Sequence, residues 1–226
     1  MTESRFPRVP VEAELDRLRQ MLLEMAGRAE ELVRMAMLGL GERDRRMTKL
    51  VRKADDRIDE LEVEMDECVL ELLALQHPMA GDLRLVFVAL KASNDIERIG
   101  DHAVNIAKAS RRMTRHPPLP DIMEVWEMGG QVRKMLGTAL DALVNRDVEK
   151  ARGVIAEDQR VDDLRRSASR IVVSYMLEQP RYISPGLEMI VVLQNLERIG
   201  DLTTNIAEDV VFLVEGRSIK HMGTLW

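Results

Sequence analysis

A segment of 14 residues occurs twice in this chain, and this repeat constrains the fold more than any other sequence feature. Residues 94–107 align with residues 194–207 without a gap, and eight of the 14 aligned positions are identical. An upstream match between residues 55–59 and 158–162 keeps the same order and nearly the same spacing. A period of about 100 residues is too long for a solenoid, so the chain is predicted to contain two copies of one small domain.

Apolar residues in each copy follow a helical spacing. In the segment 43–76 they recur in alternating steps of three and four, the heptad pattern of a helical bundle: Val51, Ala54, Ile58, Leu61, Met65, Cys68, Leu72 and Leu75. Proline and glycine punctuate the chain and predict helices over 11–40, 43–76, 80–113, 120–145, 147–178 and 184–215. Ser184 is expected to cap the last helix, with Pro185 at its first position.

The predicted fold is therefore all-α, with six long helices in two tandem, pseudo-symmetric three-helix bundles. Short connections between the helices make neighbours antiparallel. The boundary is expected in the proline-rich stretch 115–120, which gives a first bundle over 1–116 and a second over 117–226. Aromatic residues make up only 3% of the chain, which is typical of a helical protein and not of a sandwich or barrel.

Composition excludes several classes of protein. A lone cysteine, Cys68, excludes a disulfide framework and a multi-cysteine metal site. No apolar run approaches the roughly 18–20 residues that cross a bilayer, and the first residues lack the apolar segment of a secretory signal. Acidic residues number 39 and basic residues 33, which argues against a nucleic-acid partner. We therefore expect a cytoplasmic chain without a membrane span.

Paired acidic residues are the candidate binding site. Each copy holds two pairs spaced four residues apart: Asp55/Asp59 and Glu97/Asp101 in the first, and Asp158/Asp162 and Glu197/Asp201 in the second. This spacing places both carboxylates of a pair on one helix face, where they repel each other unless a cation bridges them. Ligand sets of oxygen alone suit hard cations such as Mg²⁺, Ca²⁺, Mn²⁺ or ferric iron. The alternative is a solvated, charged helix face that was copied together with the core.

The positions of these residues relative to the apolar stripe predict a surface site. Asp55, Asp59 and Glu97 directly follow stripe residues, so a metal ion would lie where two helices meet and not inside the core. Gly100 and Gly200 stand in mid-helix, where each costs about 1 kcal/mol relative to alanine. Close helix packing and clearance beside a carboxylate both explain these glycines.

The sequence contains no recognisable catalytic motif. It lacks a phosphate-binding loop, a nucleophile elbow and a His-Glu-x-x-His zinc motif. None of the four histidines has a glutamate three residues before it, so the Glu-x-x-His ligation of di-iron bundles is also absent. Binding is therefore favoured over catalysis, with a carboxylate-bridged metal enzyme and a purely structural helical bundle as the alternatives.

Three segments resemble the PhoU family, bacterial regulators of phosphate transport and phosphate signalling. They are Asp95-Ile-Glu-Arg-Ile-Gly-Asp101, Asn195-Leu-Glu-Arg-Ile-Gly-Asp201 and Asn205-Ile-Ala-Glu208. The stretch from Gln76 to Arg84 also resembles the Pro-x-Ala-x-Asp-Leu-Arg segment of the family. The resemblance covers nearly the whole chain, including the order of the segments.

The resemblance implies that the acidic pairs bind metal ions, with iron, zinc, magnesium and manganese as the candidates. It implies a cytoplasmic negative regulator of phosphate uptake and phosphate-starvation signalling. Such a protein links the ATPase of the phosphate ABC transporter to the phosphate sensor histidine kinase, as a homodimer that reaches the membrane only through its partners. Leu202 stands where the family often has histidine, which brings equal metal affinity of the two halves into question.

Overall fold

Six α-helices form most of the described chain, which in this computed structural model comprises residues 11–76 and 79–219. The first repeat contains α1 (Val11–Gly41), α2 (Met47–Gln76) and α3 (Ala80–Met113), and the second contains α4 (Met123–Asn145), α5 (Val148–Glu178) and α6 (Ile183–Glu215). A short 3₁₀ turn, η1 (Pro180–Tyr182), precedes α6. The prediction of an all-α chain with long helices is confirmed.

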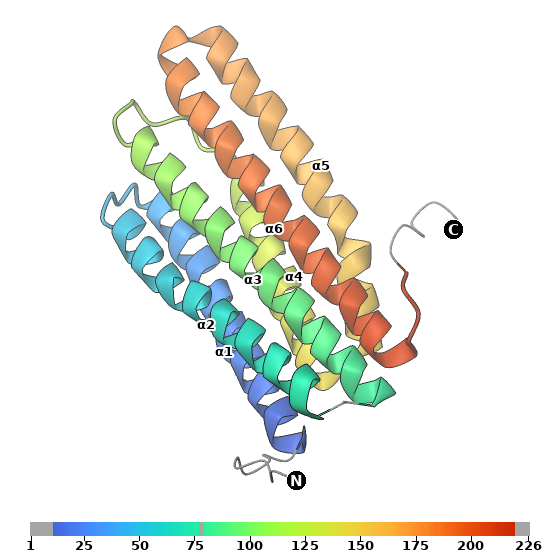
Figure 1. Ribbon diagram of the computed structural model, residues 1–226. Coiled ribbons are helices and arrows are strands. Elements are labelled where there is room, and N and C mark those ends of the chain that lie inside the picture. Colours follow the sequence, from blue (N-terminus) through green and yellow to red (C-terminus); the bar gives the residue numbers. More distant parts are fainter. Residues whose placement is uncertain (1–10, 77–78, 220–226) are drawn as a thin grey trace, which may run out of the picture.

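The two repeats pack side by side into one bundle (Figure 1). Helices α3 and α6 pack against each other and against the other helices of their own repeats, while α1 meets α4. Helices α2 and α5 flank this central pair on opposite edges of the molecule. Buried apolar residues of both repeats form one continuous core. The predicted division between residues 116 and 117 falls in the connection from α3 to α4 and stays a prediction.

The apolar stripe of α2 forms its buried face. Six of its members are at most 2% exposed: Val51, Ile58, Leu61, Met65, Cys68 and Leu72. Leu75 differs, because it lies in the last turn of the helix and is 68% exposed. The heptad pattern therefore identified the core face over all but the end of this helix.

Two predicted helix starts are a few residues early, for local reasons. Helix α2 begins at Met47 and not at residue 43, because Arg43 takes a left-handed conformation with φ 53°. Asp44 then accepts a hydrogen bond from the backbone N–H of Arg46 at 2.9 Å, which forms a turn before the helix. Helix α4 begins at Met123 and not at residue 120, because Ile122 is extended.

The predicted cap of the last helix is wrong. Helix α6 begins at Ile183 with Tyr182 in the N-cap position and no side-chain capping bond, since η1 leads directly into it. Ser184 and Pro185 thus lie inside the first turn. Proline is tolerated there because the first N–H groups of a helix have no intrahelical partner.

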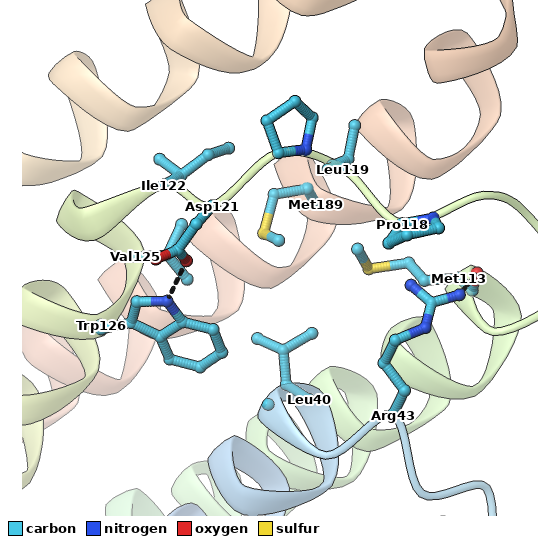
Figure 2. Close-up of a pocket in the computed structure, with 12 residues that line it drawn as sticks. Leu40, Arg43, Met113, Pro118, Leu119, Asp121, Ile122, Val125, Trp126 and Met189 are labelled. Atoms are coloured by element: carbon cyan, nitrogen blue, oxygen red, sulfur yellow. Dashed lines mark hydrogen bonds between the residues drawn. The ribbon is translucent and has the colours of Figure 1, made fainter.

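The connection between α3 and α4 borders a small, mostly apolar cavity of about 210 Å³ (Figure 2). The Arg43 guanidinium donates hydrogen bonds to the backbone carbonyls of Met113, at 3.0 Å, and His116, at 2.8 Å. Trp126 donates its indole N–H to Asp121 at 2.7 Å on the other side of the cavity. These bonds attach the connection to the turn between α1 and α2 and to α4.

Polar side chains also join the two repeats. Lys91 of α3 forms an ion pair with the buried Asp209 of α6. His102 Nδ1 lies 2.8 Å from Asn195 Oδ1, again between α3 and α6. The repeats are therefore held together by directed contacts as well as by the shared core.

Candidate metal centre

The four acidic residues predicted in the first repeat lie together where α2 packs against α3. Asp55 and Asp59 come from α2, and Glu97 and Asp101 from α3; we call these four residues the first cluster. Burial raises the pKa of Asp59 and of Glu97, and in both cases the charge of Asp101 is the next largest cause. The carboxylates of the two helices therefore act on one another, as the sequence predicted.

Asp55 is the buried member of the first cluster. It is 8% exposed, and its Oδ1 has no hydrogen-bond partner among the residues that the structure describes. Burial, followed by the charges of Asp59, Asp101 and Glu97, raises the pKa of Asp55 to about 7. Asp55 therefore lies deeper than its position beside the apolar stripe suggested. A buried oxygen without a partner is uncommon in folded proteins and points to a missing cation or donor.

Gly100 provides the space that the Asp55 carboxylate occupies. A Cβ atom added at residue 100 would collide with Asp55 Oδ1, so clearance beside the carboxylate explains this glycine. At Gly200 an added Cβ would meet Val161 Cγ1 at 3.4 Å, an ordinary van der Waals distance. The two glycines thus have different surroundings, with helix packing the better explanation in the second repeat.

The acidic residues of the second repeat occupy the corresponding positions on α5 and α6. Asp158, Asp162, Glu197 and Asp201 form this second cluster. Burial raises the pKa of Asp158 and of Asp201, and neighbouring carboxylates add to both shifts.

Within the described part of the chain, the second cluster has donors that the first lacks. The hydroxyl of Thr204 donates to Asp158 Oδ1 at 3.2 Å, which lowers the pKa of Asp158 against the effect of burial. Arg198 Nη1 lies 3.3 Å from Asp201 Oδ2. These partners stabilise two of the carboxylates without a metal ion.

Arg165 is the functional candidate that the sequence analysis missed. Its Nε lies 2.8 Å from Glu197 Oε1, which makes it a fixed positive charge on the second cluster. The alignment that matches residues 55–59 with 158–162 places Arg165 opposite Glu62, and this reversal of charge was the available signal. The arginine beside Glu97 behaves differently, because Arg98 lies 3.8 Å from Asp95 and acts on Glu97 only through its charge, which lowers the pKa of that carboxyl.

Two other candidates have structural surroundings. His102 contacts Asn195 across the repeats, as described above, and is not part of either cluster. Cys68 is buried in the stripe of α2, where burial and a 3.4 Å contact with Glu14 raise the pKa of the thiol to about 11. The thiol therefore stays protonated at neutral pH, which agrees with an inert core residue.

Neither cluster is a closed metal site as its side chains stand. Within residues 11–76 and 79–219, no three His, Cys, Asp or Glu side chains converge closely enough to hold a metal ion. The first cluster nevertheless fits a hard cation in its chemistry. It offers oxygen ligands alone and an unsatisfied buried oxygen, and no lysine or arginine of the described chain forms an ion pair with its four carboxylates. Metal binding stays a prediction.

Comparison with known proteins identifies the family. The PhoU domain matches this chain twice, over residues 22–110 and 125–210. The chain belongs to the PhoU family. The two matches also confirm the two-repeat architecture predicted from the internal sequence repeat.

Relatives cover nearly the whole chain. A Pseudomonas putida protein named "Phosphate-specific transport system accessory protein PhoU homolog" is 40% identical over 212 residues, which are 93% of this chain and 83% of that protein. The Escherichia coli PhoU accessory protein is 31% identical over 211 residues, 93% of this chain and 88% of its own length.

Solved PhoU structures show the same fold. The crystal structure of PhoU from Pseudomonas aeruginosa has a TM-score of 0.89 and 40% identity, and the match covers 92% of this chain and 100% of that one. The phosphate transport system regulatory protein PhoU from Streptococcus pneumoniae gives a TM-score of 0.85 at 27% identity, over 93% and 99% of the two chains. The PhoU family consists of accessory and regulatory proteins, which confirms the prediction of a non-enzymatic protein. None of the helices in the described ranges is long and apolar enough to pass through a membrane.

Proposed function

We propose that this chain is a metal-binding accessory protein that acts in the cytoplasm as a negative regulator of phosphate uptake and of the response to phosphate starvation. The observation that carries the phosphate role is the 40% identity, over 93% of the chain, to the phosphate-specific transport system accessory protein of Pseudomonas putida. The similarity spans both repeats and not one isolated motif, which supports a shared role for the whole bundle.

The regulator would work by recognition. It would link the ATPase of the phosphate ABC transporter to the phosphate sensor histidine kinase, as a homodimer that is bound to the membrane only through these partners. The family resemblance of the Asn94–Ala107 and Gln194–Ala207 segments supports this arrangement. Pull-down of the two partners by the purified chain tests each contact separately.

The proposed metal role centres on the first cluster. Asp55, Asp59, Glu97 and Asp101 would hold the ion, which would neutralise four like charges and tie α2 to α3. Oxygen ligands favour magnesium, manganese or iron over softer ions, with zinc as the remaining candidate from the family resemblance. An ion at this position would hold α2 and α3 in place at the outer edge of the first repeat, where a partner can bind.

Genetic complementation tests the proposal. Deleting the gene should raise transcription of phosphate-starvation genes in phosphate-rich medium, and the wild-type gene should restore repression. A variant with both Asp55→Asn and Asp101→Ala should fold but fail to repress, whereas Glu67→Gln, an exposed change on the same helix, should repress normally. Repression that does not depend on the gene would refute the phosphate role, and full repression by the double variant would refute the metal role and favour the structural-bundle alternative.

A further inference from the structure

We propose that the two acidic clusters have diverged, so that only the first requires a cation, whereas Arg165 takes the place of the cation in the second. This inference rests on the proposed metal binding. It narrows the sequence prediction, which assigned ligand roles to the carboxylates of both repeats alike.

One aligned position reverses the charge next to the clusters. Glu62 of α2 corresponds to Arg165 of α5. Glu62 faces the first cluster, because its charge contributes to the raised pKa of Glu97 and its Oε1 lies 3.5 Å from Asn94 on the same helix as Glu97. Arg165 instead contacts Glu197 of the second cluster at 2.8 Å. The first cluster thus has an additional carboxylate where the second has a guanidinium.

A second aligned position decides whether the buried carboxylate has a donor. Thr204 of α6 donates to Asp158 Oδ1, whereas its counterpart in α3 is Val104, which has no hydroxyl. Asp55, the counterpart of Asp158, consequently keeps an Oδ1 without a partner. The first repeat leaves unsatisfied the oxygen that the second repeat satisfies by itself.

The glycines give a third, independent difference. Gly100 clears space for the Asp55 carboxylate, while Gly200 packs against the Val161 side chain. A small residue beside the first cluster therefore keeps a carboxylate oxygen in place between two helices. The equivalent space in the second repeat is filled by an apolar side chain.

The two clusters should therefore differ in their affinity for a cation. A guanidinium cannot lose its proton at any physiological pH, so Arg165 is a permanent positive charge that opposes entry of a metal ion. In the first cluster an ion meets four carboxylates that form no ion pair within the described residues, with Arg98 as a positive charge outside ion-pair distance, and it satisfies a buried oxygen whose desolvation is otherwise uncompensated. The wild-type chain should therefore bind one strong cation, at the α2–α3 edge.

Reciprocal charge changes test this inference. Mn²⁺ is titrated into metal-free protein while free Mn²⁺ is followed by electron paramagnetic resonance, and thermal unfolding is recorded in parallel. We expect one tight site in the wild type, a second site in Arg165→Glu, and binding weakened at least about tenfold in Glu62→Arg. Arg170→Glu and Glu67→Arg make the same charge changes at exposed positions on the same two helices and should bind as the wild type does.

The possible outcomes separate the inference from the proposed function. Two equivalent Mn²⁺ sites in the wild type, or a folded Arg165→Glu variant without a second site, would overturn the divergence of the clusters alone. If Arg165→Glu does not fold, Arg165→Gln serves in its place, because it removes the guanidinium without adding a charge. The Arg165→Gln variant should gain a weaker second Mn²⁺ site, and the absence of that site would equally overturn the inference. A wild type that binds no Mn²⁺ would overturn the metal role itself, and the inference with it.

Discussion

Replacing Asp55 by asparagine should stabilise the metal-free protein at pH 8. The pKa of Asp55 is raised from its ordinary 3.8 to about 7, mainly by burial, so the folded state disfavours the ionised carboxylate. A rise of roughly three pKa units corresponds to about 4 kcal/mol of lost stability above pH 7. Asparagine keeps the size of the side chain and removes the charge. We expect the free energy of unfolding to rise by roughly 2–4 kcal/mol, since the side-chain amide still lacks a partner for one polar atom.

This effect has a defined dependence on pH. Because the pKa of Asp55 is higher in the folded than in the unfolded chain, the folded state binds the proton more readily between about pH 4 and pH 7. The contribution of Asp55 to the stability of the metal-free wild type should therefore become more favourable as the pH falls through this window. The stability difference between the Asp55→Asn variant and the wild type should shrink over the same window and be smallest near pH 4.

Urea denaturation with a chelator, at fixed protein concentration, measures both effects. Asp56→Asn is the matched control, because the same change one residue away affects an exposed side chain and should alter stability by less than about 0.5 kcal/mol. The reasoning is refuted if Asp55→Asn is no more stable than the wild type at pH 8, or if its pH profile follows that of the wild type.

Further changes test other contacts. Gly100→Ala should destabilise the fold by about 1 kcal/mol or more, because the new methyl group collides with the Asp55 carboxylate. Gly200→Ala should instead be neutral or stabilising by up to about 1 kcal/mol, and urea denaturation measures both changes. Lys91→Met should lower the free energy of unfolding by about 2–4 kcal/mol, because it removes the positive charge that pairs with the buried Asp209; an unchanged midpoint of thermal unfolding would contradict this. Cys68 should react with a thiol reagent at pH 8 only as fast as the protein unfolds, and rapid labelling of the native state would contradict its burial and raised pKa.

Helix positions could be predicted because they depend on patterns within one segment. The three-and-four spacing identified the core face of α2, and the positions of proline and glycine gave the number of helices before any packing was known. The starts of α2 and α4 were less accurate. Before α2, Arg43 adopts a left-handed conformation that few non-glycine residues take and that no local pattern predicts, and before α4 the extended Ile122 delays the helix. The expected Ser184 cap failed because η1 supplies the turn that the serine would have begun.

The members of the acidic clusters could be predicted from the sequence, but the burial of Asp55 and the ion pair between Arg165 and Glu197 could not. The spacing of four placed each pair on one helix face, and the structure brings the pairs of neighbouring helices together. Asp55 is buried because α3 approaches it at Gly100, a contact between helices that the sequence of α2 alone does not contain. Arg165 and its partner Glu197 are 32 residues apart on different helices, so their ion pair also depends on packing. Such differences are visible where aligned positions of the two repeats carry different residues, as at Glu62 and Arg165.

The shared core has a consequence for the origin of the duplication. A half-length chain that ended after α3 would expose to water the face that α3 now buries against α6. Such a chain would need a second copy of itself to cover that face, and its stability would depend on concentration. Joining two copies in one polypeptide made the association of the two halves intramolecular and allowed their sequences to diverge separately.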